Sequence, residues 1–276
     1  MKKILVPCDF SEISYNASVY AVQMAAALKK EVFFLHVFHI PVIDPNMAPE
    51  MVDDMIEEEQ KTAHKELEKF KERLQVLITS LGVVAHFELK IGFTVEEIVK
   101  RASEMDLFMI IMGTRGASGL NRILGSNTSL VIEKCKSPVL AVPEKAHYAG
   151  ISHIVYATDL KSEDYQYIDQ LLYISSRFSA RITLLHVSKP GEVPDKERVE
   201  ELKTYFWRDL AMENIQFEIV INEHVEEGIE DYLESHGADI LAMLKHRRNI
   251  IERIFNPSIT KRMTFHPKFP ILIFHG

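Results

Sequence analysis

The sequence predicts an α/β protein in which two tandem copies of a doubly wound, Rossmann-like domain each carry a five-stranded parallel sheet. Its length of 276 residues suits two domains of about 140 residues each. Short sequence segments recur in the same order in the two halves of the chain. Within each half, short apolar runs alternate with amphipathic stretches, which is the pattern of successive βαβ units.

The internal repeat defines the two domains. Two pairs of segments match at an offset of 150 residues, and two later pairs match at an offset of 131 or 132, so the second copy has lost about 18 residues. In chain order the pairs are residues 4–10 with 154–160, 34–37 with 184–187, 108–112 with 239–243, and 137–140 with 269–272. These matches predict one domain over residues 1–146 and a second over residues 151–276, joined by a short linker.

Five apolar runs, most of them continuous, predict the strands of copy one, because a strand buried on both faces of a parallel sheet needs no polar alternation. They cover residues 4–7, 32–37, 83–89, 107–112 and 139–142. The first helix follows the first strand from Ser11, whose hydroxyl suits an N-cap. A long second helix is predicted over residues 50–81, which are rich in Glu, Lys and Leu.

The third and fourth helices follow the third and fourth strands. Thr94 and Glu97 have the spacing of a capping box, which predicts a helix from Thr94 to about Met105. Ser126 is placed to cap the fourth helix, which is expected to run to Lys134. Copy two is expected to have the same order of elements, with a shorter second helix over about residues 196–212.

Composition and charge narrow the classes of function. The net charge of −8 argues against binding nucleic acid or an anionic membrane through bulk electrostatics. No apolar run approaches the ~18 residues that span a bilayer, and no secretion signal is expected. The two cysteines, Cys8 and Cys135, have neither the spacing of a metal site nor that of a disulfide framework, so we expect a cytoplasmic protein.

A ligand site is expected where the strand order reverses, beyond the carboxyl ends of the first and fourth strands. Asp9 follows the first strand, and a carboxylate there can accept hydrogen bonds from a ribose hydroxyl or an exocyclic amine. Four of the chain's 11 glycines lie within residues 113–125, and residues 126–128 then open a helix whose N-terminus favours phosphate. Each feature alone also fits a plain turn or a helix cap, but together they favour nucleotide binding.

The same loop carries a family resemblance, which covers essentially the whole chain. The chain resembles a tandem universal stress protein, and ATP-binding members of that family carry Gly-x2-Gly-x9-Gly-Ser/Thr after the fourth strand. The family glycines fall on Gly113, Gly116 and Gly125, although only eight residues separate the last two. The nucleotide-binding residues that the resemblance implies, together with the helix start, are Pro7, Asp9, Val37, Met112, Gly113, Gly116, Gly125, Ser126, Asn127 and Thr128.

The resemblance also implies a ligand and an assembly. ATP is the expected ligand, and a Mg²⁺ ion is an optional companion that the phosphates, rather than a protein cage, would hold. The two domains are expected to pack as an intramolecular pseudo-dimer, and a homodimer of the whole chain is left open. Neither nucleic acid nor a membrane is expected as a partner.

Copy two departs from this pattern in its loop. It keeps Asp159, but residues 243–258, after its fourth strand, contain no glycine. Its basic residues Lys245, Arg247 and Arg248 fit a solvated loop better than an anion site. We therefore expect one nucleotide per chain, bound in copy one.

Several other side chains have plain structural interpretations. His36 and His186 occupy equivalent positions in the two copies, which favours packing over metal ligation, and the spacing of His36 and His39 predicts that they point to opposite faces. Cys8 is interpreted as a small buried residue. The acidic residues 53–59 fit a solvated helix start, with a lid over the site as the alternative.

The function that follows is a cytoplasmic, ATP-binding stress protein that regulates or contacts partners. No nucleophile–base pair and no catalytic residue can be named, so an enzyme is not expected. Two alternatives stay open: a weak ATPase or nucleotidyl-transfer enzyme, and an interaction protein that binds no nucleotide.

Overall fold

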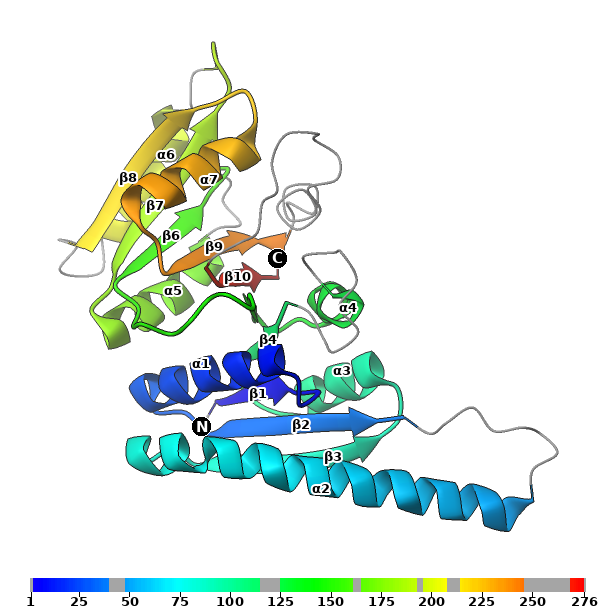
Figure 1. Ribbon diagram of the computed structural model, residues 1–276. Coiled ribbons are helices and arrows are strands. Elements are labelled where there is room, and N and C mark those ends of the chain that lie inside the picture. The colour runs from blue at the N-terminus through cyan, green and yellow to red at the C-terminus, as the bar shows by residue number, and fades with distance from the viewer. Residues whose placement is uncertain are drawn as a thin grey trace. The chain divides into compact units, whose positions relative to one another are not determined.

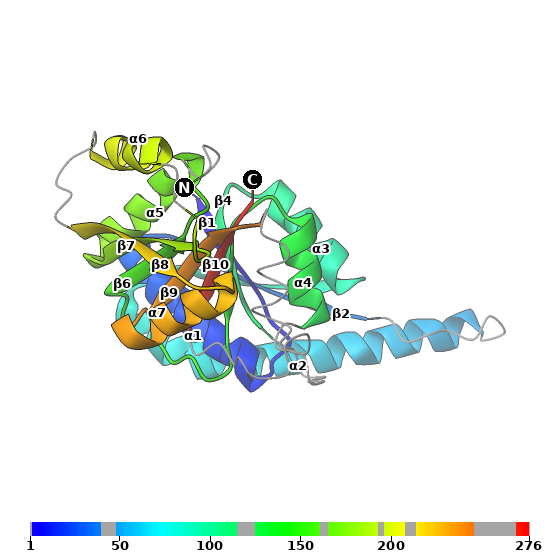
Figure 2. The ribbon, with the colours of Figure 1, turned by 90° about the horizontal axis from the view of Figure 1, so that it is seen from above.

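The computed structural model describes residues 2–39, 48–114, 125–160, 165–192, 196–207, 214–245 and 269–275. The chain forms two compact units, Met1–Tyr148 and Ala149–Gly276 (Figures 1 and 2). Each unit is an α/β fold around five parallel strands, so the predicted fold class of tandem Rossmann-like domains is confirmed. Among the described helices, none is both long enough and apolar enough to cross a membrane.

The first unit has a parallel sheet in the order β3-β2-β1-β4-β5. Helix α1 packs against α2, and α3 packs against α4. Right-handed crossovers place these two pairs on opposite faces of the sheet, because the chain reverses direction after β3. The elements are β1 (Lys3–Pro7), α1 (Glu12–Leu28), β2 (Val32–Phe38), α2 (Pro49–Leu81), β3 (Ala85–Ile91), α3 (Thr94–Glu104), β4 (Leu107–Gly113), α4 (Ser126–Lys134) and β5 (Val139–Val142).

The second unit repeats this plan with the strand order β10-β9-β6-β7-β8. Its central strand β6 corresponds to β1 of the first unit. The elements are β6 (His153–Ala157), α5 (Tyr165–Phe178), β7 (Arg181–Ser188), α6 (Lys196–Trp207), β8 (Ile215–Ile221), α7 (Val225–His236), β9 (Ile240–Leu244) and β10 (Ile271–Phe274). The second helix of this unit is shorter than α2, as the sequence predicts.

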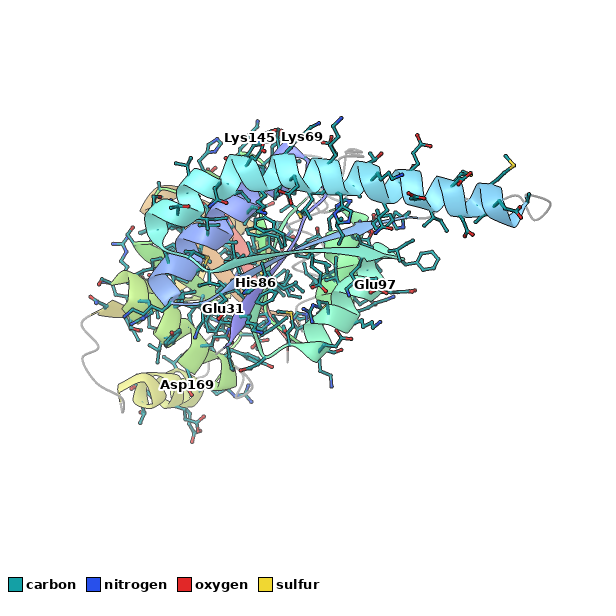
Figure 3. The ribbon with its side chains drawn as sticks, turned by 90° about the horizontal axis from the view of Figure 1, so that it is seen from below. Glu31, Lys69, His86, Glu97, Lys145 and Asp169 are labelled. Carbon is teal, nitrogen blue, oxygen red and sulfur yellow. The ribbon has the colours of Figure 1, made fainter. Side chains whose placement is uncertain are left out.

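The central strands form the core of each unit. In β1, Ile4 lies opposite Val32 of β2 and Met109 of β4, and all three side chains are fully buried. Strand β3 is the edge of the first sheet, and its outer residues are polar: His86 lies 3.3 Å from the Glu31 carboxylate (Figure 3), and Glu88 accepts a hydrogen bond from Arg101. Polar and charged side chains on an edge strand protect it from pairing with another chain.

Helix α2 is the longest element, and five inward residues fix it to the sheet. Ala63, Leu67, Phe70, Leu74 and Ile78 are buried at spacings of three and four residues, which is one stripe of a helix. The helix ends at Gly82, whose φ of 63° is accessible to glycine without a Cβ penalty. Its N-terminal part extends beyond the carboxyl end of β2 (Figures 1 and 2).

The predicted helix caps have different outcomes. Ser11 is the N-cap of α1, where its hydroxyl accepts a hydrogen bond from the Ser14 N–H at 3.2 Å. The capping box at Thr94 is wrong: Phe93 is the N-cap of α3, without a side-chain bond, because the Thr94 hydroxyl faces His39 instead. Ser126 is not a cap either, since Gly125 holds that position and Ser126 is the first helical residue of α4.

Candidate functional site

A cavity of about 470 Å³ opens in the first unit at the carboxyl ends of β1, β2 and β4. This is the point where the strand order reverses, so its position agrees with the predicted ligand site. Nine of the ten sequence-predicted residues line it: Pro7, Asp9, Val37, Met112, Gly113, Gly125, Ser126, Asn127 and Thr128. The tenth, Gly116, lies outside the described residues.

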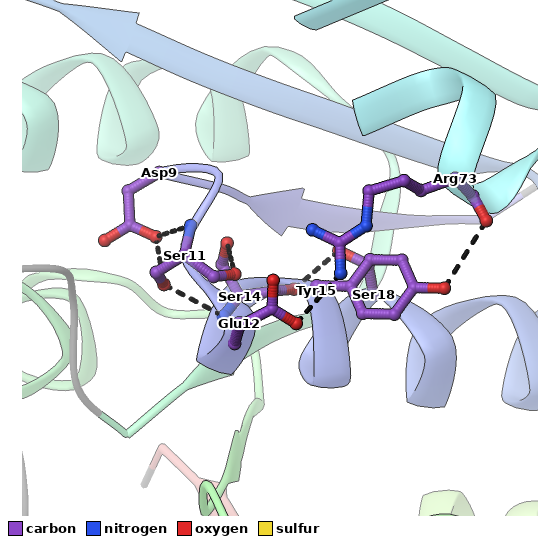
Figure 4. Close-up of polar contacts among 7 residues, drawn as sticks. All are labelled: Asp9, Ser11, Glu12, Ser14, Tyr15, Ser18 and Arg73. Carbon is purple, nitrogen blue, oxygen red and sulfur yellow. Dashed lines mark hydrogen bonds and ion pairs between the residues drawn. The ribbon is translucent and has the colours of Figure 1, made fainter. Parts of the chain in front are cut away.

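The turn after β1 presents Asp9 through a local hydrogen-bond network (Figure 4). One carboxylate oxygen of Asp9 accepts bonds from the Ser11 N–H at 3.1 Å and from the Ser11 hydroxyl at 2.6 Å. Ser11 in turn caps α1 through Ser14. Asp9 therefore supports the start of α1 as well as lining the cavity.

Phe10 and His36 fix the inner side of the same turn. Phe10 has a φ of 64°, which is the left-handed region that non-glycine residues rarely adopt. Its ring stacks on the His36 imidazole with centroids 4.1 Å apart. Nδ1 of His36 lies 2.8 Å from the Cys8 carbonyl oxygen, and because a carbonyl only accepts, Nδ1 carries the proton. The turn is thus held from both sides.

The second unit contains the same turn. Leu160, the equivalent of Phe10, also has a φ of 64°. Nδ1 of His186 donates to the Thr158 carbonyl oxygen at 3.0 Å, as His36 does in the first unit. The two histidines thus make the same backbone hydrogen bond, which agrees with the predicted packing role.

The far wall of the cavity is the junction of β4 and α4. The Thr128 hydroxyl donates to the Gly113 carbonyl oxygen at 2.8 Å and ties the first turn of α4 to the end of β4. The Gly125 N–H donates to the Thr114 carbonyl oxygen. Because Gly125 offers no side chain as a cap, the first N–H groups of α4 face the cavity end without a capping side chain.

The cavity also contains residues that the sequence did not single out as site residues. His39, which follows the end of β2, lines it together with His36, Ser14, Glu59, Thr94 and Ile98. The prediction that His36 and His39 point to opposite faces is misleading, because His39 follows the last residue of β2 and both histidines line one cavity. Nε2 of His39 lies 3.0 Å from the Thr94 hydroxyl oxygen.

Burial determines the chemistry of two groups in the cavity wall. Burial, followed by the negative charge of Asp9, raises the pKa of the Cys8 thiol well above its usual range. A thiol held protonated in this way is a poor nucleophile, which agrees with the interpretation of Cys8 as a small buried residue. Burial also lowers the pKa of His36, although its bond to the Cys8 carbonyl partly opposes that shift.

Two further features bear on ligands. Within the described ranges, no group of three or more His, Cys, Asp or Glu side chains is arranged to hold a metal ion. In the second unit the loop after β9 is described only through Lys245, so Arg247, Arg248 and the rest of that loop lie outside the described residues.

Comparison with known proteins identifies a family over both units. The model of the universal stress protein family matches residues 1–143 and 150–275 of this chain. Universal stress protein MJ0531 of Methanocaldococcus jannaschii is 32% identical over 145 residues, which cover 51% of this chain and 81% of that protein. Universal stress protein MJ0577 of the same organism is 33% identical over 156 residues, which cover 52% of this chain and 96% of that protein.

A solved structure shares the fold of the whole chain. The crystal structure of a universal stress protein from Archaeoglobus fulgidus DSM 4304 has a TM-score of 0.73 to this one. The match covers 99% of this chain and 98% of the other at 18% sequence identity, so it bears on the fold alone.

Proposed function

The chain belongs to the universal stress protein family, and on that premise we propose that its first unit binds ATP. The observation that carries this proposal is the convergence of nine predicted nucleotide-binding residues on one cavity, although they come from four separate parts of the first unit. A volume of about 470 Å³ is within the usual range of small-molecule sites.

The phosphates belong at the start of α4. The first N–H groups of a helix and its positive dipole end attract anions, and no side chain caps this helix. Gly113 and Gly125 leave room for the ligand to approach the backbone on either side of the junction. The residues present therefore fit a phosphate chain, and a Mg²⁺ ion, where it accompanies ATP, would be held by the phosphates.

The nucleoside belongs over β1 and β2. Asp9 would accept hydrogen bonds from ribose hydroxyls, and Pro7, Val37 and Met112 would provide apolar contacts for the base. Bound ATP stabilises the unit that holds it by mass action. ATP would also favour one ordered conformation of the site, and a partner protein would detect that change.

We place this activity among binding functions rather than enzymatic ones. The buried Cys8 thiol is held protonated, and Nδ1 of His36 is engaged by a carbonyl, so neither is arranged as an activated nucleophile. An assay of multiple-turnover ATP hydrolysis with the full chain tests this point, and release of many phosphates per chain would contradict it.

The duplication and the cysteines also bear on how the chain assembles and where it is found. We expect the two units to pair within one chain as a pseudo-dimer, since both carry the same fold and the family resemblance implies that pairing. We also expect a cytoplasmic protein, because Cys8 and Cys135 are both buried and neither is part of a disulfide. Sedimentation of the full chain tests the assembly: a monomer is expected, and a stable homodimer would favour the alternative.

Isothermal titration of ATP into nucleotide-free protein tests the central proposal. Saturable binding is expected, and it should be weakened far more by Gly116→Val than by Gly119→Ala. The sequence aligns Gly116 with a family glycine at the phosphates, whereas Gly119 lies in the variable span, so the second variant is the matched control. Failure of the wild-type chain to bind any adenine nucleotide would favour a pure interaction protein.

A further inference from the structure

Helix α2 breaks its own apolar pattern at Glu59. Val52, Ile56, Ala63 and Leu67 lie on one face of the helix, with a gap of seven residues between Ile56 and Ala63. Position 59 falls in that gap on the same face, three residues after Ile56 and four before Ala63. A carboxylate stands where the pattern calls for an apolar residue.

The broken position lies at the cavity. Glu59 is exposed, and it lines the cavity one helical turn before Ala63, the first fully inward residue of α2. Its neighbour Glu58 does not line the cavity, and the nearby cation Lys61 is held by Glu57 at 2.6 Å. Of the acidic residues at the start of α2, Glu59 is thus the one that the structure brings to the candidate site.

The two ends of the cavity have opposite electrostatic character. The uncapped N-terminus of α4 lies at the β4 end, where it favours negative charge. Glu59, His39 and Thr94 lie at the β2 end, and Asp9 stands between them, after β1. Because β1 is next to β4 in the sheet, Asp9 lies between the two ends, and Glu59 is the carboxylate at the end away from the helix N-terminus.

The geometry points to Glu59 as a specificity-determining residue that excludes nucleotides with a phosphate on the ribose and admits those whose charge is confined to the 5′ chain. This inference rests on the proposed function, because it needs the 5′ phosphates at α4. In that orientation the ribose lies over Asp9, and its 2′ and 3′ substituents face the β2 end. Hydroxyl groups there would donate to carboxylates, whereas a phosphate would be repelled.

The expected size of the effect follows from the exposure of Glu59. Two like charges in contact through water repel by about 1 kcal/mol, which corresponds to roughly a fivefold change in affinity. A phosphate carries close to two charges at neutral pH, which at contact would give an effect of roughly 25-fold. Because Glu59 is exposed and salt screens its charge, we expect a smaller, three- to tenfold effect from this one carboxylate. Because the site is open, the effect should shrink as salt is added.

Two isomeric ligands isolate the effect. Adenosine 5′-diphosphate and adenosine 3′,5′-bisphosphate are isomers that differ in where the second phosphate is attached. The bisphosphate also carries about one more negative charge, so the readout is the change in their affinity ratio between variants and not the ratio itself. Their affinities are measured by calorimetry for the wild-type chain, Glu59→Gln and the matched control Glu58→Gln, at low and high salt. Glu59→Gln is expected to shift the affinity ratio toward the 3′,5′ isomer by three- to tenfold at low salt, and Glu58→Gln is expected to leave the ratio as in the wild type.

Each outcome has a distinct meaning. Equal ratios in the wild type and Glu59→Gln, or an equal shift in Glu58→Gln, would overturn the role of Glu59 while leaving nucleotide binding intact. Failure of the wild-type chain to bind the 5′-diphosphate would instead overturn the proposed function, and the inference with it. A shift seen only in Glu59→Gln, and reduced by salt, supports the inference.

Discussion

Asp9 carries two roles in the first unit, and they need different chemistry. Its carboxylate lines the cavity, and one of its oxygens also holds the backbone and hydroxyl of Ser11, the cap of α1 (Figure 4). The cap needs only an acceptor oxygen, which an amide also offers. A ribose contact benefits from the full negative charge. Substitutions at this one residue can therefore separate stability from binding.

Asp9→Ala is expected to lower both the stability of the chain and its affinity for ATP, whereas Asp9→Asn is expected to lower mainly the affinity. Loss of the cap support in the alanine variant should reduce the free energy of unfolding by about 0.5–2 kcal/mol. ATP affinity should fall in both variants, by the roughly 0.5–3 kcal/mol of a lost or weakened hydrogen bond. Urea denaturation and calorimetry on the two variants check this. ATP affinity equal to that of the wild type in both would remove Asp9 from the site.

Because of His36 and His153, the free energy of unfolding of the chain should be lower in mild acid than at neutral pH. Burial is the main cause that lowers the pKa of each histidine, so the unfolded state binds more protons than the folded state. The stability they contribute is complete above the unfolded pKa of about 6.5 and falls as the pH drops below it. Urea denaturation at pH 7.5 and 5.5 measures the loss.

Histidine variants assign this pH dependence. His36→Gln and His153→Gln should each reduce the difference in unfolding free energy between the two pH values. The exposed His64 provides the matched control, and His64→Gln should retain the wild-type difference. An identical pH dependence in all three variants would show that other groups control acid stability.

At the scale of elements, the junction of β4 and α4 is fixed by one buried hydroxyl. Thr128 is buried and donates to the Gly113 carbonyl oxygen, which aligns the first turn of α4 with the strand end. The position of the helix N-terminus, and so of any anion bound there, depends on this bond.

Thr128→Val keeps the shape of the side chain and removes the donor. It should lower the free energy of unfolding by about 1–3 kcal/mol, because it leaves a buried carbonyl without this partner. It should also weaken ATP binding. Thr128→Ser retains the hydroxyl and serves as the control in thermal denaturation and titration. Equal affinities in the valine and serine variants would contradict a role for this bond in placing the helix.

The sequence predicted the elements well and their contacts less well. Continuous apolar runs located β1, β2, β4 and β5, because burial on both faces of the sheet leaves little ambiguity there. The edge strand β3 begins at Ala85, two residues later than predicted, since its half-exposed pattern marks the boundary weakly. Ser11 was predicted as a cap because its partner lies three residues away.

Long-range contacts escaped prediction. Thr94 has the spacing of a cap, but it contacts His39, which lies 55 positions earlier in the chain. For the acidic run that includes Glu59 the sequence leaves two interpretations, a solvated helix start and a lid over the site, because no local pattern shows which of these residues reaches the cavity. The resemblance predicts nucleotide-binding residues that the structure places at β1, β2, β4 and the start of α4, whereas the β2 end of the cavity depends on how α2 and α3 pack.

At the scale of the whole molecule, the two units share a fold but differ in the loop after their fourth strand. Both keep the strained turn after the first strand, at Phe10 and Leu160. Only the first unit has glycines in its loop sequence, and residues such as Leu244 and Lys245 begin the corresponding segment of the second. Residues with a Cβ pay about 1–2 kcal/mol each to adopt the left-handed geometry that a backbone cradle uses.

We therefore predict one ATP per chain. Titration of nucleotide-free protein should saturate near a ratio of one, and Asp9→Ala should weaken this single event. Asp159→Ala in the second unit, the matched change, should leave it as in the wild type. A ratio near two, or loss of binding in Asp159→Ala, would contradict the asymmetry between the units.

The repeated histidine bond gives the molecule a pair of built-in spectroscopic probes. His36 and His186 each hold a ring proton against a backbone carbonyl, and ring protons protected in this way give slowly exchanging resonances in the downfield region of a proton spectrum. The first proton belongs to a residue that lines the cavity, and the second reports from the equivalent turn of the other unit. A variant of each histidine would assign its resonance. The two resonances would then report on the two units separately in a single sample.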